Sequence, residues 1–76
     1  MGLILYSASW CDACKVLKVQ LKKAGIDFEE RSLDDDGYIL EAQKLGIKSL
    51  PAVRIQGQNV ALSTSSIERV KSFVRE

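Results

Sequence analysis

A chain of 76 residues, 46% of them hydrophobic and 28% charged, has the composition of one small globular domain. The net charge is +1 and the lysines and arginines are scattered, which argues against a nucleic-acid-binding patch. No apolar run approaches the length of a membrane span, and the first residues lack the pattern of a signal peptide, so we expect a cytoplasmic protein.

The first half of the chain alternates strand and helix patterns. The apolar run 2–6 predicts a central strand that is covered on both faces. Residues 12–24 place apolar side chains at helical spacing before a glycine, which predicts an amphipathic helix. Residues 26–33 predict a second, more exposed strand near a sheet edge. The run 34–36, which is all aspartate, offers an N-cap for a short helix that ends before Gly46.

The second half of the chain predicts a hairpin and a final helix. Residues 51–55 and 59–62 are strand-like and are separated by a turn that contains Gly57. Ser65 and Glu68 have the spacing of a capping box and precede an apolar stripe of helical period. The predicted order is β-α-β-α-β-β-α, in a single domain that spans residues 1–76.

Both cysteines lie in a Cys-x-x-Cys motif between the first predicted strand and the first predicted helix, which is typical of thiol-disulfide exchange. Cys11 would lie at the helix N-terminus, where unpaired amides and the helix dipole favour a thiolate. Cys14 follows one helical turn deeper on the same face, from where it could attack a mixed disulfide at Cys11. Asp12 and Lys15 place opposite charges nearby, so their net effect has no predicted sign.

Other interpretations of the motif stay open at this point. A structural zinc site needs four ligands, usually Cys or His, and the chain has no histidine and no third cysteine. A zinc or an iron–sulfur cluster that bridges two chains is an alternative, as is a binding module that kept the fold without the chemistry. Trp10 is interpreted as part of a substrate-facing surface, and Tyr6 as the buried end of the first strand.

The motif Trp-Cys-Asp-Ala-Cys-Lys at residues 10–15 resembles the Trp-Cys-x-x-Cys-Lys site of thioredoxins. The chain length and element order resemble a minimal glutaredoxin, and residues 49–51 (Ser-Leu-Pro) resemble the Thr-Val-Pro segment of the same superfamily. The resemblance implies an α/β thioredoxin fold with a four-stranded mixed sheet and three helices. It also implies that Pro51 is cis and that the backbone of Leu50 faces the disulfide.

The segment that holds glutathione in many glutaredoxins differs here. Residues 62–66 contain neither the Gly-Gly pair nor the acidic pair of those proteins, and residues 7–9 contain no basic residue. Hydroxyl groups and helix N-terminal amides at residues 64–66 could still receive a carboxylate. The departures are similar to those of glutaredoxin-like redoxins that have thioredoxin-like activity and donate electrons to ribonucleotide reductase. Thioredoxin reductase and glutathione both remain candidate reductants.

The predicted function is therefore a dithiol-disulfide oxidoreductase that acts on protein disulfides as a monomer. Its catalytic residues are Cys11 and Cys14, which form a redox-active disulfide, and no metal or bound cofactor is expected. The predicted substrate-binding surface surrounds them and comprises Trp10, Asp12, Ala13, Lys15, Leu50, Pro51, Ser63, Thr64, Ser65 and Ser66.

Overall fold

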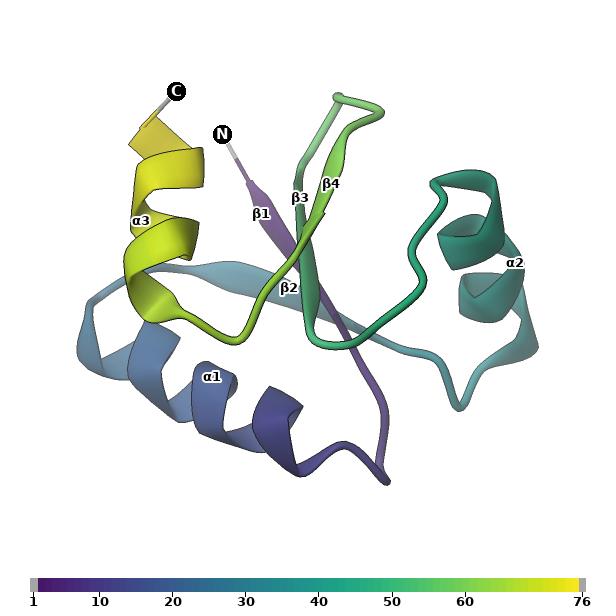
Figure 1. Cartoon of the computed structure of the whole chain (residues 1–76), viewed down its shortest axis with the longest axis horizontal. Helices are drawn as coiled ribbons and strands as arrows, with labels where there is room; N and C mark the ends of the chain where they lie inside the picture. The colour runs from purple at the N-terminus through teal and green to yellow at the C-terminus, as the bar shows by residue number, and fades with distance from the viewer. Residues whose placement is uncertain (1, 76) are drawn as a thin grey trace.

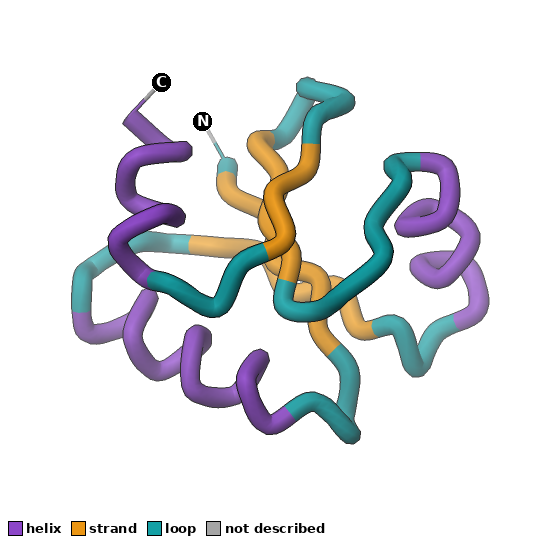
Figure 2. Tube along the Cα trace, in the orientation of Figure 1, coloured by secondary structure: helices purple, strands orange, loops and turns teal. Residues whose placement is uncertain are grey.

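The computed structural model describes residues 2–75 of the chain. Three helices surround a four-stranded sheet (Figures 1 and 2). Among the described residues, none of the helices combines the length and the apolar character that crossing a membrane requires. The elements in chain order are β1 (Leu3–Ser7), α1 (Asp12–Lys23), β2 (Phe28–Ser32), α2 (Asp36–Lys44), β3 (Ala52–Ile55), β4 (Ala61–Ser63) and α3 (Ile67–Arg75).

The strand order in the sheet is β2-β1-β3-β4. β1 is parallel to β2, which requires the crossover that α1 supplies, and β3 is antiparallel to both β1 and β4. Every residue of β1 is buried, whereas β2 is half-buried or exposed along its whole length. The structure thus confirms the thioredoxin fold, the central first strand and the edge position of the second.

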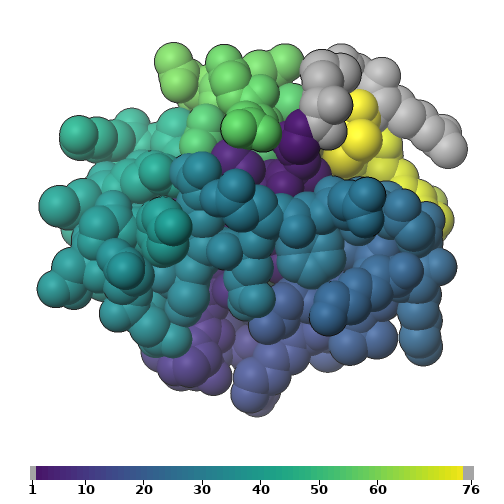
Figure 3. Space-filling model, turned by 180° about the vertical axis from the view of Figure 1, so that it is seen from behind, coloured from purple at the N-terminus to yellow at the C-terminus, as the bar shows by residue number. Residues whose placement is uncertain are grey.

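Alternation along β1 divides the core between the two faces of the sheet. Leu3 and Leu5 point to the face that α1 and α3 cover, where they pack with the fully buried Leu17 of α1. Ile4 and Tyr6 point to the opposite face, on the side of α2. Because burying a large apolar side chain contributes about 1.5–3 kcal/mol, the larger cluster holds α1 firmly against the sheet. Figure 3 shows the molecule from behind, where later segments cover most of β1.

The turn between β3 and β4 is longer than the sequence pattern predicts. β4 begins at Ala61, two residues after the predicted start, because residues 56–60 form an exposed turn between β3 and β4. Gly57 supplies a φ of +89° in this turn, a conformation that side chains disfavour.

The helix caps agree with the predictions in one case and correct them in another. Asp35 caps α2, and its Oδ1 accepts a hydrogen bond from the amide of Gly37 at 2.8 Å. The predicted capping box at Ser65 is wrong by one residue. Ser66 directly precedes α3, and its Oγ accepts from the amide of Arg69 at 3.4 Å. Ser65 and Ser66 carry the same side chain, so the sequence alone does not tell which of them caps the helix, and only the course of the backbone decides it.

A polar cluster joins α2 to the sheet. The hydroxyl of Tyr6 donates to Glu41 Oε2 and accepts from Arg54 Nε at 3.0 Å, while Arg31 Nη1 donates to the same carboxylate oxygen at 2.6 Å. The hydrogen bond from Tyr6, followed by the one from Arg31, holds the pKa of Glu41 below its ordinary value. Burial is the main cause that raises the pKa of Tyr6. Tyr6 is therefore a fully buried strand residue, as predicted.

Candidate functional site

Several loops meet at one end of the sheet. β1 and β4 end there and β3 begins there, since Tyr6 pairs with Ala52 and Ala52 pairs with Ser63. The loops 8–11, 45–51 and 64–66 therefore converge, along the lower part of the molecule in Figure 1. This end carries the Cys-x-x-Cys motif.

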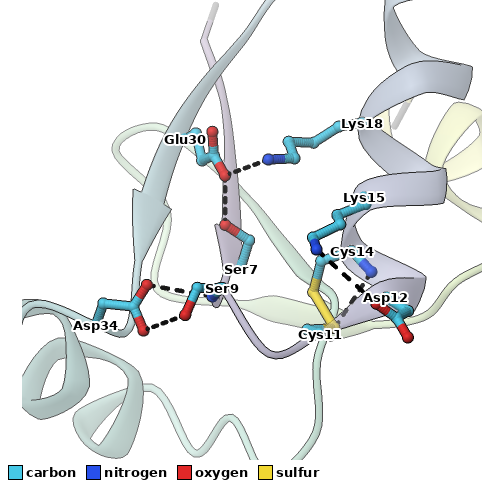
Figure 4. Close-up of a disulfide and its surroundings, with 9 residues drawn as sticks. All are labelled: Ser7, Ser9, Cys11, Asp12, Cys14, Lys15, Lys18, Glu30 and Asp34. Atoms are coloured by element: carbon cyan, nitrogen blue, oxygen red, sulfur yellow. Dashed lines mark hydrogen bonds and ion pairs between the residues drawn. A yellow bond between two sulfur atoms is a disulfide. The ribbon is translucent and has the colours of Figure 1, made fainter.

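Cys11 and Cys14 form a disulfide with Cα atoms 5.3 Å apart (Figure 4). Cys11 is the N-cap residue of α1 and has extended backbone, with φ −102° and ψ 101°. The amide of Cys14 points at the sulfur of Cys11, with 3.2 Å between N and Sγ. The sulfur thus takes the place of the oxygen that usually caps a helix. After reduction, the same amide and the helix dipole would stabilise a thiolate at Cys11.

The two cysteines differ in their exposure to solvent. Cys11 keeps 7% of its surface exposed, whereas Cys14 is fully buried. A substrate disulfide can therefore meet Cys11 but not Cys14. This asymmetry favours the predicted roles of Cys11 as the attacking sulfur and Cys14 as the resolving sulfur.

Leu50 lies against this disulfide, and Pro51 follows it directly before β3. Their peptide bond is cis, as the family resemblance implies. Leu50 is half-buried and packs against the cluster that Ala8 forms with the two cysteines. The amide of Thr64 donates to the carbonyl of Pro51 at 3.0 Å, which ties the segment after β4 to the same place.

The remaining residues of the predicted binding surface are mostly exposed. Trp10 is 72% exposed, and Asp12, Ala13 and Lys15 lie on the open side of the first turn of α1. The Lys15 ammonium lies 3.9 Å from the Asp12 carboxylate, and such exposed pairs contribute about 0–1 kcal/mol. In the segment that leads into α3, the exposed residues are Ser63 and Ser65 and the half-buried ones are Thr64 and Ser66. Their binding roles stay predictions.

A polar cluster that the sequence analysis did not predict links β1, α1 and β2 (Figure 4). The hydroxyl of Ser7, which is 2% exposed, donates to Glu30 Oε2 at 2.6 Å, and Lys18 Nζ donates to the same oxygen at 2.8 Å. The hydrogen bond from Lys18, then that from Ser7, lowers the pKa of Glu30. Since Lys18 follows Cys14 by one helical turn, the cluster fixes α1 against β2. The spacing of Lys18 on the helix does not identify a partner, and only the strand register brings Glu30 within its reach.

A second cluster positions the loop that carries Trp10. The hydroxyl of Ser9 donates to Asp34 Oδ1 at 3.1 Å, and the hydroxyl of Ser32 donates to Asp34 Oδ2 at 2.9 Å. The hydrogen bond from Ser32, and then the one from Ser9, keeps the pKa of Asp34 below its ordinary value. The loop after β1 is thereby joined to the loop after β2. Within the acidic run 34–36, Asp35 thus caps α2 and Asp34 links two loops by hydrogen bonds.

The chemistry of the site is that of a dithiol. Residues 2–75 contain no cluster of three or more His, Cys, Asp or Glu side chains that could hold a metal ion. Cys11 and Cys14 would supply only two of the four ligands that a structural zinc requires. Their geometry instead fits reversible oxidation between a disulfide and two thiols.

Comparison with solved structures supports the fold. The thioredoxin-like protein BC3987 is similar with a TM-score of 0.78 and 22% identity, over 93% of this chain and 97% of that chain. The short form of thioredoxin f from spinach chloroplast is similar with a TM-score of 0.76 and 17% identity, over 97% of this chain and 72% of that chain. Thioredoxin 1 from the thermophilic eubacterium Thermosipho africanus TCF52B is similar with a TM-score of 0.66 and 25% identity, over 99% of this chain and 91% of that chain.

A search of curated proteins finds no match to the sequence. Among protein families, the glutaredoxin family model matches residues 3–60. The matched region runs from β1 to the turn before β4 and includes both cysteines and Pro51. The chain therefore belongs to the glutaredoxin family and is a thiol-disulfide oxidoreductase with a Cys-x-x-Cys motif.

Proposed function

We propose that this protein reduces disulfides of other proteins in a thioredoxin-like manner in the cytoplasm, with ribonucleotide reductase as one candidate acceptor. Its oxidised form would be recycled by thioredoxin reductase. The observation that carries the proposal is the pairing of a slightly exposed cysteine at a helix N-terminus with a fully buried cysteine one turn behind it. The first sulfur suits attack on a large partner, and the second suits release of that partner.

The reaction proceeds in two exchanges. The thiolate of Cys11 attacks one sulfur of the substrate disulfide, so that a mixed disulfide forms and the other substrate sulfur leaves with the electron pair as a thiolate. Cys14 then gives up its proton, which the substrate thiolate released in the first exchange accepts, and attacks the sulfur of Cys11. The Cys11–Cys14 bond forms, the mixed disulfide breaks, and the second substrate sulfur leaves as a thiolate. Two electrons have then moved from the protein to the substrate.

The segment that leads into α3 supports the thioredoxin-like route. The amide of Thr64 is bonded to the carbonyl of Pro51, and the amide of Ser66 is bonded to the hydroxyl of Thr64 at 3.0 Å. Two of the amides that could receive a glutathione carboxylate are therefore engaged within the protein. The same segment contains no acidic residue and no glycine.

Glutathione-dependent turnover is the alternative, and the match to the glutaredoxin family favours it. Parallel assays with an insulin disulfide as the acceptor separate the two routes. One assay supplies glutathione and its reductase, and the other supplies thioredoxin reductase. We expect faster turnover in the second assay, and turnover with glutathione alone would contradict the proposed route.

Two variants test the mechanism itself. Cys11→Ser should lose all turnover in either assay, because it lacks the attacking sulfur. Cys14→Ser should still attack the substrate and then accumulate as a mixed disulfide, which mass spectrometry of the acid-quenched reaction detects. Full activity of Cys11→Ser would refute the assignment of the two sulfurs.

A further inference from the structure

A groove of about 630 Å³ runs along α1 on the side that faces β2. Its α1 wall contains Lys15, Lys18 and Lys22, and its β2 wall contains Phe28 and Glu30. The loop that connects α1 to β2 closes the groove at the end of α1 that lies farthest from the disulfide. The groove thus leads away from the reactive sulfurs along the whole helix.

The α1 wall of the groove is basic. Residues 13–26 contain four lysines and no acidic residue. Three of these lysines, Lys15, Lys18 and Lys22, follow one another at spacings of three and four residues, so they lie on one side of α1. Figure 4 shows Lys15 and Lys18 extending from α1 toward the side on which Glu30 lies.

Two lysines of this row remain open to the charge of a partner. Lys18 Nζ is bonded to Glu30 at 2.8 Å. Lys15 and Asp12 are 3.9 Å apart and both exposed, so their pairing is weak. Lys22 is exposed and forms no ion pair within the described part of the chain. The hydrogen bond from Lys18 and, to a smaller degree, the charge of Lys22 lower the pKa of Glu30, so Lys22 acts on the same groove.

Apolar side chains lie between the charges. Val19, Ile26 and Phe28 line the groove; Val19 is 52% exposed and the other two are half-buried. An apolar side chain of a partner that covered them would leave water for an apolar surface. The acidic lining residue besides Glu30 is Asp27, in the loop at the far end. The groove therefore fits a segment that is acidic and carries an apolar residue.

The position of the groove relates it to the disulfide exchange. At about 1.5 Å per helical residue, Lys15 lies about 6 Å and Lys22 about 16 Å from Cys11 along the axis of α1. An extended polypeptide advances about 3.3 Å per residue. A partner whose cysteine is joined to Cys11 can therefore place the residues about two to five positions from that cysteine beside the lysines.

We propose that the groove between α1 and β2 docks an acidic segment of the protein partner whose disulfide Cys11 reduces, with an apolar side chain of that segment against Phe28. The inference rests on the proposed function. The docked segment takes no part in the exchange of sulfurs, and it increases the rate of encounter by charge complementarity. Because salt screens exposed charges, its contribution falls as the ionic strength rises.

Symmetric disulfides of synthetic peptides test the docking. The positions about two to five residues before or after the cysteine carry glutamate with one leucine, glutamine with one leucine, or glutamate with one serine. Second-order rate constants for the reduced protein, from chromatography after acid quench, are divided by those for dithiothreitol, which corrects for the intrinsic reactivity of each peptide. In one series we expect glutamate to exceed glutamine about tenfold at about 20 mM salt and less than about twofold at about 500 mM. Leucine should exceed serine about threefold.

Two variants locate the effect. Lys22→Glu should lower the glutamate-to-glutamine rate ratio at least several-fold. Lys23→Glu, the same charge change at the next residue of α1, which is exposed but does not line the groove, is the matched control and should keep most of the ratio. Equal rates for glutamate and glutamine in both series, or equal effects of the two variants, would overturn the docking site and leave the proposed function standing. Failure to reduce any peptide or insulin would instead refute the proposed function.

Two other occupants are tested with the same variants. A second copy of the chain in the groove would give a dimer in sedimentation equilibrium that Lys22→Glu dissociates. An anionic membrane would give binding to phosphatidylserine vesicles that Lys22→Glu removes. Either result would overturn the assignment to a protein partner, and a monomer that does not bind the vesicles supports it.

Discussion

Replacing Glu41 by glutamine removes the carboxylate that joins α2 to the sheet. In the native protein its Oε2 accepts from buried Tyr6 and from Arg31, and it lies 3.6 Å from Arg54 Nη2. The side chains of Arg31 and Arg54 are only 19% and 12% exposed, so solvent replaces the lost partner poorly. Hydrogen bonds to charged groups contribute about 1.5–3 kcal/mol each, and glutamine keeps one acceptor oxygen. We expect the variant to lose about 2 kcal/mol of unfolding free energy.

The loss should depend on pH in a defined direction. The pKa of Glu41 is lower in the folded protein than its ordinary value of 4.5, so the ionised carboxylate favours folding. Its contribution is fully present above the unfolded pKa and disappears as the pH falls through the folded pKa. The difference in stability between the native protein and Glu41→Gln should therefore shrink as the pH is lowered below about 4.5.

Thermal unfolding of the oxidised proteins, followed by circular dichroism, measures this effect. For a domain of this size, 2 kcal/mol corresponds to a fall in Tm of roughly 8–16 °C. Glu29→Gln is the matched control, because Glu29 also pairs with Arg31 but its side chain is 54% exposed, and it should cost less than about 1 kcal/mol. Equal losses in the two variants, or a loss for Glu41→Gln that persists at low pH, would refute the reasoning.

Three further substitutions test the fold, each by denaturant unfolding at neutral pH. Leu17→Ala empties a fully buried site between α1 and the sheet and should cost about 2–5 kcal/mol; a cost under 1 kcal/mol would contradict the packing of α1. Asp35→Ala removes the cap of α2 and should cost about 0.5–2 kcal/mol, whereas Asp36→Ala, one residue inside the helix, should cost less. Gly57→Ala strains a residue at φ +89° with open space around it and should cost about 1 kcal/mol, and an unchanged stability would show that the turn adapts.

Much of the fold could be predicted because its signals are local. The apolar run of β1 and the helical spacing of α1 each lie within a dozen residues, and the Cys-x-x-Cys motif falls between them. Placing Cys11 at a helix N-terminus needed no tertiary information. The cis state of Pro51 was implied by family resemblance alone, since nothing in its own sequence context dictates the isomer.

The features that escaped prediction depend on register and on distant pairs. The hydrogen bond between Tyr6 and Glu41 joins residues that are 35 positions apart, and that between Arg54 and Tyr6 spans 48 positions. Each exists only because β1 and β3 are neighbours in the sheet and α2 lies on one face of that sheet. The cluster of Glu30 with Ser7 and Lys18 likewise depends on the pairing of β1 with β2. Sequence periodicity assigns such residues to a face but not to a partner.

The alkylation of the reduced protein by iodoacetamide tests the central claim most directly. Rates measured over a series of pH values, with the modified residue identified by mass spectrometry, give the pKa and the accessibility of each sulfur. Stabilisation by the amide of Cys14 and the helix dipole predicts that Cys11 reacts first, with a midpoint below the ~8.5 of a free cysteine, while Cys14 stays protected. A midpoint for Cys11 at or above that value, or equal reaction of the two sulfurs in the folded protein, would contradict it.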